Sequence, residues 1–244
     1  VDDAAAVRLI PRLLERGVRT IGFSATGAAG DRRLAHMLTA ENILPTADGL
    51  GFLAKLDGSG VAVEVPVVGH YNISNLLGVV CVALACGVNF AAAVAALPHL
   101  APPLGRMQRV VRPDAPLAVV DYAHTPDALA QALLALRPLA ESRRGKIWVV
   151  FGAGGDRDPG KRAPMGAAAA SGADVVVVTS DNPRTEDPSA IVAQVALGAR
   201  DARELVCLLD RTEAIAHAVQ KAAPEDIVLV AGKGHEDYQV VGTS

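Results

Sequence analysis

The chain has 244 residues, 51% of them hydrophobic, with 23 Lys and Arg against 26 Asp and Glu and a formal net charge of -3. This length and composition predict a folded protein of one or two domains and exclude a disordered chain. The balanced charge, together with an aromatic content of 3%, argues against a nucleic-acid partner, which would need a basic face or stacking rings.

The first half of the chain predicts a mixed α/β arrangement. Capping by Asp2 or Asp3 and a stop at Gly17 delimit a first helix, and segment 25–38 shows no clear periodicity. The expected elements are, in chain order, a helix from residue 3 to about residue 16, a strand over 18–23, and strands over 50–56 and 61–67 joined by a turn at 57–60.

An uncharged stretch over 76–97 is long enough for a membrane span. Its interior carries Gly87-Val88-Asn89, which is a helix-stop signal. The stretch therefore predicts two short buried helices joined by a turn, and no membrane span. The proline-containing segment 101–105 then breaks the pattern, so a domain boundary is expected there, between residues 1–104 and residues 105–244.

Short apolar runs alternate with helical patterns in the second half, as expected for a parallel, doubly wound sheet that is buried on both faces. The helix starts carry capping chemistry, with Thr125 or Asp187 before a proline and Asp210 three residues before Glu213. The expected strands cover 117–120, 147–151, 175–179, 205–209 and 227–231. The expected helices cover 126–137, 161–171, 188–199 and 211–222.

Three cysteines, Cys81, Cys86 and Cys207, are too few and too scattered for a disulfide framework or a zinc site. We interpret them as small buried hydrophobic residues in a reducing, cytoplasmic compartment. The chain opens at residues 1–3 without Met and without a basic, apolar secretion signal. We therefore expect a fragment of a longer protein.

Loops that follow the strands of such a sheet share one edge, where ligands bind. Here these loops carry charges of both signs, whereas the opposite edge has ordinary polar turns. A zwitterionic ligand suits this pattern, because guanidinium groups hold its carboxylate and acidic groups hold its ammonium. The charged residues on that edge are Arg157, Lys161, Arg162, Arg184 and Lys233 against Asp121, Asp156, Asp158, Asp181 and Glu236.

A glycine-rich loop of the second half fits the G-x-x-x-x-G-K pattern of a phosphate loop. Arg162, however, stands where Ser or Thr would bind Mg²⁺, and Pro159 removes a backbone donor. Asp156 and Asp158 would repel phosphate, and we expect them to be local turn and salt-bridge partners of Arg157 and Arg162. The pattern therefore disfavours a nucleotide loop at this position.

These loops together closely resemble those of the Mur ligases, and among them the ligases that add meso-diaminopimelate. In this family Asp-Asn-Pro-Arg, present here as residues 181–184, is the recognition motif for meso-diaminopimelate as opposed to lysine. The resemblance implies part of a central ATPase-like domain over 1–104, followed by a C-terminally truncated, Rossmann-like domain for the acceptor amino acid over 105–244. The matching stretches are Gly69–Asn75, Gly105–Met107, Asp121–Asp127, Gly152–Met165, Asp181–Arg184 and Gly232–Glu236.

The resemblance implies an ATP-dependent ligase of peptidoglycan precursor synthesis, with ATP and Mg²⁺ as cofactors and UDP-MurNAc-L-Ala-D-Glu as the second substrate. ATP phosphorylates a carboxylate of that substrate, and the amine of meso-diaminopimelate attacks the acyl-phosphate. For meso-diaminopimelate the resemblance implies binding by Arg157, Asp181, Asn182, Pro183, Arg184, Gly232 and Glu236. For ATP it implies contacts from Asn72, Arg106, Asp121 and His124.

The sequence departs from the family pattern in several places. It lacks the Gly-Lys-Thr phosphate loop, the N-terminal uridine-nucleotide domain, the metal-binding residues and the carbamoylated lysine. No catalytic residue or metal ligand is therefore assigned, and the chain alone is expected to be inactive. Two other functions stay open: a folylpolyglutamate synthetase, and a non-catalytic small-molecule binding module. Asp121 also suits a strand-end cap, and Asn72 or Asn75 a helix cap.

Overall fold

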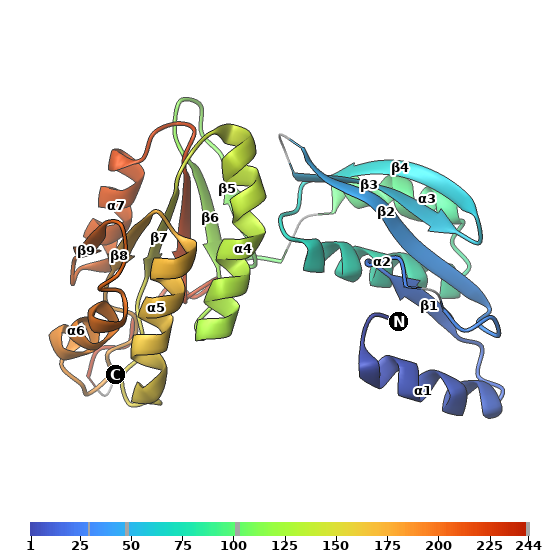
Figure 1. The fold of residues 1–244 in the computed structure, drawn as a ribbon, viewed down its shortest axis with the longest axis horizontal. Helices are drawn as coiled ribbons and strands as arrows, with labels where there is room; N and C mark the ends of the chain where they lie inside the picture. The colour runs from blue at the N-terminus through green and yellow to red at the C-terminus, as the bar shows by residue number, and fades with distance from the viewer. Residues whose placement is uncertain (29, 47–48, 101–102, 243–244) are drawn as a thin grey trace. The chain divides into compact units, whose positions relative to one another are not determined.

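The structure is a computed structural model that describes residues 1–28, 30–46, 49–100 and 103–242. The chain divides into two compact units, Val1–Ala101 and Pro102–Ser244 (Figure 1). The division falls within the segment where we expected a boundary, whose residues 101 and 102 lie outside the described part. Each unit is described by itself below.

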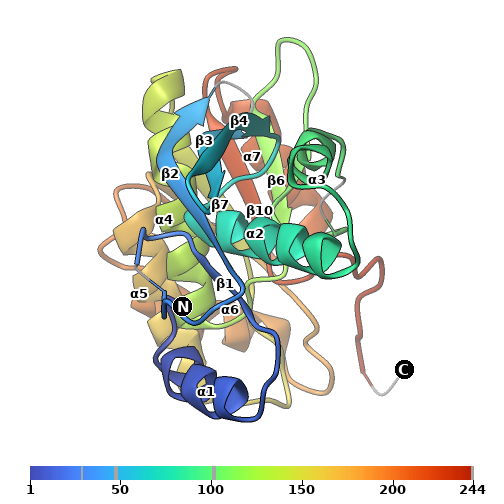
Figure 2. The ribbon, with the colours of Figure 1, turned by 90° about the vertical axis from the view of Figure 1, so that its right-hand side faces the viewer.

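The first unit is built on a four-stranded sheet with the order β1-β2-β3-β4. β1 pairs parallel to β2, and the other neighbours pair antiparallel. Helices α2 and α3 complete the core with Ile73, Leu77 and Val94, which are fully buried (Figure 2). The elements are α1 (Ala4–Glu15), β1 (Ile21–Ser24), β2 (His36–Thr46), β3 (Gly49–Leu56), β4 (Ser59–Val65), α2 (His70–Ala85), α3 (Phe90–Ala96) and a 3-10 helix (Leu97–His99).

Most of the expected elements of this unit are present, including the two helices on either side of residues 87–89. Among the described residues, no helix has the length and hydropathy that a membrane crossing requires. The strand β2 was not expected. The burial predicted for the cysteines is wrong for Cys86, which is exposed at the end of α2, and for Cys207, which is exposed on an edge strand. Cys81 is partly buried, and this burial raises the pKa of its thiol to about 11.

The second unit is a six-stranded sheet with the order β5-β6-β10-β7-β8-β9. All neighbours pair parallel except β5, which is antiparallel to β6. Helices α4 and α5 lie on one side of the sheet and α7 on the other (Figures 1 and 2), which confirms the doubly wound arrangement. The elements are β5 (Gln108–Val110), β6 (Leu117–Asp121), α4 (Pro126–Arg143), β7 (Ile147–Phe151), a 3-10 helix (Pro159–Lys161), α5 (Arg162–Gly172), β8 (Val175–Val178), α6 (Pro188–Gly198), β9 (Leu205–Cys207), α7 (Arg211–Lys221) and β10 (Ile227–Ala231).

The predicted caps hold three helices of this unit in place. The side chains of Thr125, Asp187 and Asp210 each accept a hydrogen bond from a backbone N–H of the first turn that follows. These helices begin where the sequence predicted. Because β6, β10, β7 and β8 are parallel neighbours, the loops after their carboxyl ends come together at one edge.

Candidate functional site

The loops after β6, β7, β8 and β10 enclose a cavity of about 410 Å³ in the second unit. Six of the seven residues that we expected to bind meso-diaminopimelate line it, and Pro183 does not. His124, expected at ATP, lines the same cavity, whereas Arg106 and Asp121 do not. Both signs of charge meet here, as the loop pattern predicted. The charged lining residues are Arg157, Lys161 and Arg184 against Asp158, Asp181 and Glu236.

Close backbone contacts hold the loops after β7 and β8 together. The N–H of Gly155 donates to the carbonyl of Asn182 at 2.9 Å. A Cβ atom on Gly155 would lie 1.9 Å from the carbonyl oxygen of Pro183, so only glycine permits this approach. Gly232 has a φ of +110°, and a Cβ there would lie 2.8 Å from Asp181 Oδ2. The cavity walls therefore depend on glycine at these two positions.

Arg162, the first residue of α5, connects the same two loops and also contacts α6. Its side chain is 2% exposed, and Nη2 donates to Glu186 Oε1 at 2.7 Å while Nη1 donates to Gln194 Oε1 at 3.0 Å. Our prediction that Asp156 or Asp158 pairs with Arg162 is wrong. Asp156 instead accepts from the Thr185 hydroxyl at 2.8 Å, and Asp158 accepts from the N–H of Gly160 at 2.8 Å in a local turn.

Arg184 is held at the rim by both its side chain and its backbone. Its Nη1 donates to the carbonyl of Gly155 at 2.7 Å. Its N–H donates to the Val240 carbonyl at 3.1 Å, and its own carbonyl accepts from the N–H of Gly242 at 2.7 Å. The chain after β10 thus folds back and pairs with the Asp-Asn-Pro-Arg loop. Since a guanidinium has five N–H donors in a planar fork, donors remain for a ligand carboxylate.

Glu236 is the best-supported acidic group of the cavity. Tyr122 Oη donates to its Oε1 at 3.2 Å, and Lys233 Nζ and Asn182 Nδ2 donate to its Oε2 at 3.3 Å and 3.4 Å. Burial raises the pKa of Glu236, but the bond and charge of Lys233 and the bonds from Tyr122 and Asn182 outweigh it, so the pKa lies below its usual value. The carboxylate is therefore ionised at neutral pH and suits an ammonium group.

Tyr122 lies between Glu236 and a second pair of residues, Arg106 and His124. The Arg106 guanidinium lies 4.8 Å from the centre of the Tyr122 ring, and the His124 ring lies 5.0 Å from it, edge to face. The hydrogen bond to Glu236 and its negative charge raise the pKa of Tyr122. Arg106 and His124 are both exposed.

Asp121 serves as a strand-end cap in this structure. Its carboxylate accepts from the N–H of Met107 at 2.9 Å and from that of Ala123 at 2.8 Å, and the residue is 9% exposed. In the first unit, Asn72 lies in the first turn of α2, and its Nδ2 donates to the Val68 carbonyl at 2.7 Å. Gly69, not an asparagine, occupies the N-cap of α2. Contacts of Asp121 and Asn72 with ATP stay predictions.

Three residues of the site, Tyr122, Lys161 and Lys233, were not among those that we predicted to bind a ligand. Lys233 and Tyr122 hold Glu236, and Lys161 Nζ donates to the carbonyl of His124 at 3.1 Å. The positions of Lys161 and Lys233 on the charged edge were a usable signal. Nothing in the sequence pattern indicated that Tyr122 would donate to Glu236.

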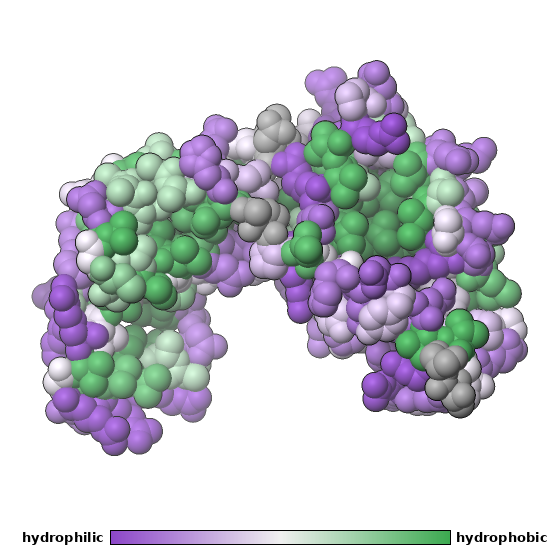
Figure 3. Space-filling model, turned by 180° about the vertical axis from the view of Figure 1, so that it is seen from behind, coloured by the Kyte–Doolittle hydropathy of each residue, from purple (hydrophilic) through white to green (hydrophobic). Residues whose placement is uncertain are grey.

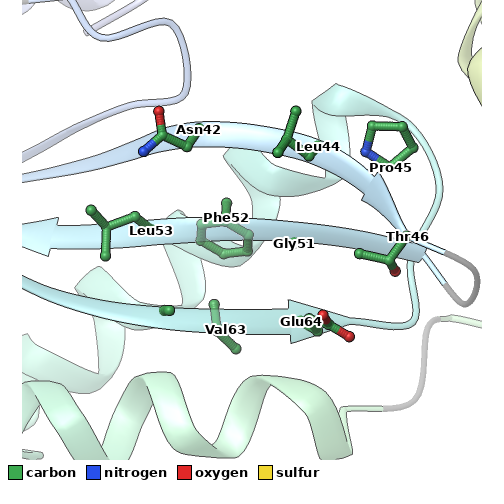
Figure 4. Close-up of a pocket in the computed structure, with 10 residues that line it drawn as sticks. Asn42, Leu44, Pro45, Thr46, Gly51, Phe52, Leu53, Val63 and Glu64 are labelled. Carbon is green, nitrogen blue, oxygen red and sulfur yellow. The ribbon is translucent and has the colours of Figure 1, made fainter.

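A larger cavity, of about 590 Å³, lies on strands β2–β4 of the first unit (Figure 4). Its lining includes Leu44, Leu53 and Phe52, with Glu64 as its charged member. Figure 3 also shows hydrophobic residues gathered on both units. Apolar surface of this kind offers no guanidinium N–H donors to a carboxylate. The mixed-charge cavity is therefore the better candidate site for a zwitterionic ligand. Among the described residues, no group of three or more His, Cys, Asp or Glu side chains is arranged to hold a metal ion.

Comparisons with known proteins indicate the family to which the chain belongs. A family model described as Mur ligase, glutamate ligase domain, matches residues 105–234. Two curated proteins named UDP-N-acetylmuramoyl-L-alanyl-D-glutamate--2,6-diaminopimelate ligase are similar to the chain. The one from Ralstonia nicotianae is 48% identical over 243 residues, which is 98% of this chain and 47% of that protein. The one from Alkalilimnicola ehrlichii is 44% identical over 244 residues, which is 99% of this chain and 47% of that protein.

A solved structure of a ligase with the same name is also similar, with 38% sequence identity and a TM-score of 0.71. The match covers 100% of this chain and 49% of that chain. The chain thus spans about half the length of the relatives that it matches.

Proposed function

The chain belongs to the Mur ligase family, and we propose that it is part of an ATP-dependent ligase that joins meso-diaminopimelate to UDP-MurNAc-L-Ala-D-Glu in the cytoplasm, for peptidoglycan synthesis. Relatives at 48% and 44% identity that carry the diaminopimelate ligase name support this proposal. No comparable observation favours a folylpolyglutamate synthetase or a non-catalytic binding module. In this proposal, residues 105–244 form the acceptor domain and residues 1–104 are part of the ATP-binding domain.

The cavity suits one end of a diamino dicarboxylic acid, where a carboxylate and an ammonium group share a carbon. Meso-diaminopimelate is lysine with a second carboxylate on its far carbon. Arg184 and Arg157 offer planar donor pairs for that carboxylate, and Glu236 and Asp181 offer oxygen atoms for the neighbouring ammonium. The observation that carries the proposal is that guanidinium and carboxylate groups from three loops line the same cavity.

The chemical task of the cavity is orientation. When one end of the amino acid is held, the amine at the other end is placed to attack an acyl-phosphate carbon. A C–N bond then forms, the C–O bond to phosphate breaks, and the amine loses a proton. Effective concentration, rather than a general base from this cavity, is the contribution that we propose for these residues.

ATP is part of the proposal, but the described residues fit it only in part. Arg106 and His124 are exposed and offer donors for phosphate or ribose, whereas the Asp121 carboxylate already accepts two backbone N–H groups. A Gly-Lys-Ser/Thr phosphate loop is absent from the 244 residues. We propose that Asn72, Arg106, Asp121 and His124 assist ATP binding in the longer protein, which would supply the main contacts with ATP and Mg²⁺.

We expect the 244-residue chain by itself to release no phosphate from ATP, because the phosphate-binding loop of the family is absent from it. A coupled phosphate assay with meso-diaminopimelate and UDP-MurNAc-L-Ala-D-Glu checks this expectation. The full-length Ralstonia nicotianae relative serves as the positive control. Steady phosphate release that scales with the concentration of the purified chain would contradict the prediction.

We expect the chain to bind meso-diaminopimelate more tightly than L-lysine by roughly tenfold or more, because lysine leaves the guanidinium groups of the cavity without a carboxylate (about 2 kcal/mol). Calorimetric titration of both ligands measures the preference. Arg184→Ala should remove most of it, and Arg184→Lys should restore only part, since an ammonium lacks the planar fork. Arg200→Ala, at an exposed site outside the cavity, is the control. Equal affinity of the wild-type chain for the two ligands would refute the substrate assignment.

A further inference from the structure

Lys233 carries a buried ammonium group between two loops of the cavity. The residue is 9% exposed. Its Nζ donates to Asn182 Oδ1 at 3.0 Å and to Glu236 Oε2 at 3.3 Å, and it lies 5.4 Å from the centre of the Tyr238 ring. A buried charge is tolerated only with partners of this kind. The ammonium therefore joins the loop after β8 to the loop after β10.

The first consequence concerns the side-chain amide of Asn182. Its Oδ1 accepts from Lys233 Nζ and, at 2.9 Å, from the N–H of Val240. Since both partners are donors, the oxygen must face them, and both of its lone pairs are engaged. The Nδ2 atom then points to Glu236. Asn182 thus offers a ligand an N–H donor and not an oxygen acceptor, which suits the carboxylate end of an amino acid.

The second consequence concerns the carboxylate of Glu236. Oε2 takes the hydrogen bonds of Lys233 and Asn182, whereas Oε1 takes the single hydrogen bond of Tyr122. A carboxylate oxygen has about two acceptor positions. The acceptor position that remains is thus on Oε1, and Glu236 lines the cavity. Lys233 in this way determines which oxygen is left for a ligand.

We propose that Lys233 is a positioning residue, whose buried ammonium orients the Asn182 amide and the Glu236 carboxylate so that Glu236 Oε1 receives the ammonium group of the diamino acid. This inference rests on the function proposed for the same cavity. It adds Lys233 as a residue that touches no substrate and yet determines how well the ammonium group of the ligand is recognised.

The pKa of the Glu236 carboxyl tests the role of Lys233 without a ligand. Lys233 is a cation within ion-pair distance of Glu236, 3.3 Å away, so its removal should raise the pKa of that carboxyl. Other titratable and charged groups also surround Glu236, and the same groups are present in each variant that is compared. The titratable and charged groups around it are Tyr122, His124, Arg157, Asp158, Lys161, Asp181, Arg184, Arg211, Asp237 and Tyr238, with Arg106 beyond Tyr122.

The experiment is a ¹³C NMR titration of the Glu236 carboxyl in the ligand-free chain, with the signal assigned by Glu236→Gln. We expect Lys233→Met to move the midpoint to higher pH and Lys233→Arg to leave it low. Lys221→Met, which removes one exposed charge at the end of α7, should leave it unchanged. Calorimetry should show that Lys233→Met binds meso-diaminopimelate roughly tenfold more weakly than the wild type. As the pH falls and Glu236 takes up a proton, binding should be lost at a higher pH in this variant than in the wild type.

An unchanged Glu236 midpoint in folded Lys233→Met would overturn the inference. If that variant does not fold, the wild-type chain gives a second test. The ¹⁵N signal of a buried ammonium with two hydrogen bonds should be protected from exchange with solvent. A freely exchanging Nζ of Lys233 would also overturn the inference. Failure of the proposed function has a different signature. In that case the Glu236 midpoint moves as expected, but the wild-type chain does not bind meso-diaminopimelate.

Discussion

Asp226→Ala is expected to lower the free energy of unfolding of the second unit by about 4 kcal/mol. Asp226 lies at the opposite edge of the sheet from the cavity and is 6% exposed. Its carboxylate accepts from the N–H of Lys146 at 2.7 Å, the N–H of Ala223 at 2.9 Å and Trp148 Nε1 at 3.0 Å. Truncation leaves these donors without their acceptor in a buried place, and each such loss is costly.

Urea unfolding followed by far-UV circular dichroism measures this loss, and fluorescence of Trp148, the one tryptophan of the chain, gives a local signal. Asp201→Ala is the matched control, because Asp201 is exposed and pairs with the exposed Arg200 at 3.7 Å. It should change stability by less than about 0.5 kcal/mol. The folded fraction of Asp226→Ala should keep the affinity of the cavity for its ligand. A loss below about 1 kcal/mol would show that the three donors find other acceptors.

The second unit was largely predictable because its signals are local. The strand Ile147–Phe151 and the strand Val175–Val178 are continuous apolar runs, and every residue in both is buried. Capping residues marked the helix starts to within one residue. The parallel order then brought the loops to one edge, which is why six residues expected at the acceptor line one cavity.

The strand β2 escaped prediction for an identifiable reason. Its pairing with β3 shifts register between Glu41 and Leu44, and Asn42 has a φ of 54°. A residue with positive φ breaks the alternation of side chains between the two faces. The two-residue period that identifies a half-buried strand is therefore lost in the middle of the segment.

The contacts that support the site could not be predicted from the sequence, for another reason. The partner of Arg162 is Glu186, and Asn182 is oriented by Lys233 and by the backbone of Val240. These contacts join residues 24, 51 and 58 positions apart. Spacing rules within one helix or strand do not reach such pairs. Motifs thus predicted which loops meet, but not which groups inside them are bonded to one another.

Gly155→Ala is expected to destabilise the second unit by about 3 kcal/mol and to weaken binding of meso-diaminopimelate by roughly tenfold or more. The added Cβ would lie 1.9 Å from the carbonyl oxygen of Pro183. That oxygen belongs to the backbone and has no rotamer by which to move away. The loops after β7 and β8 must therefore separate, which breaks the bond from Arg184 Nη1 to the Gly155 carbonyl and displaces a guanidinium proposed to hold the ligand.

Gly78→Ala is the matched control, since it adds the same methyl group inside helix α2, where the nearest atom is Phe23 Cζ at 3.8 Å. Alanine favours a helix over glycine, so this variant should gain about 0.5 to 1 kcal/mol. Thermal unfolding and calorimetric titration of both variants separate a steric effect from a general response to a methyl group. If Gly155→Ala binds meso-diaminopimelate as tightly as the wild type, the contact between these two loops does not set the position of Arg184. The guanidinium would then be held by its backbone pairing with Val240 and Gly242 alone.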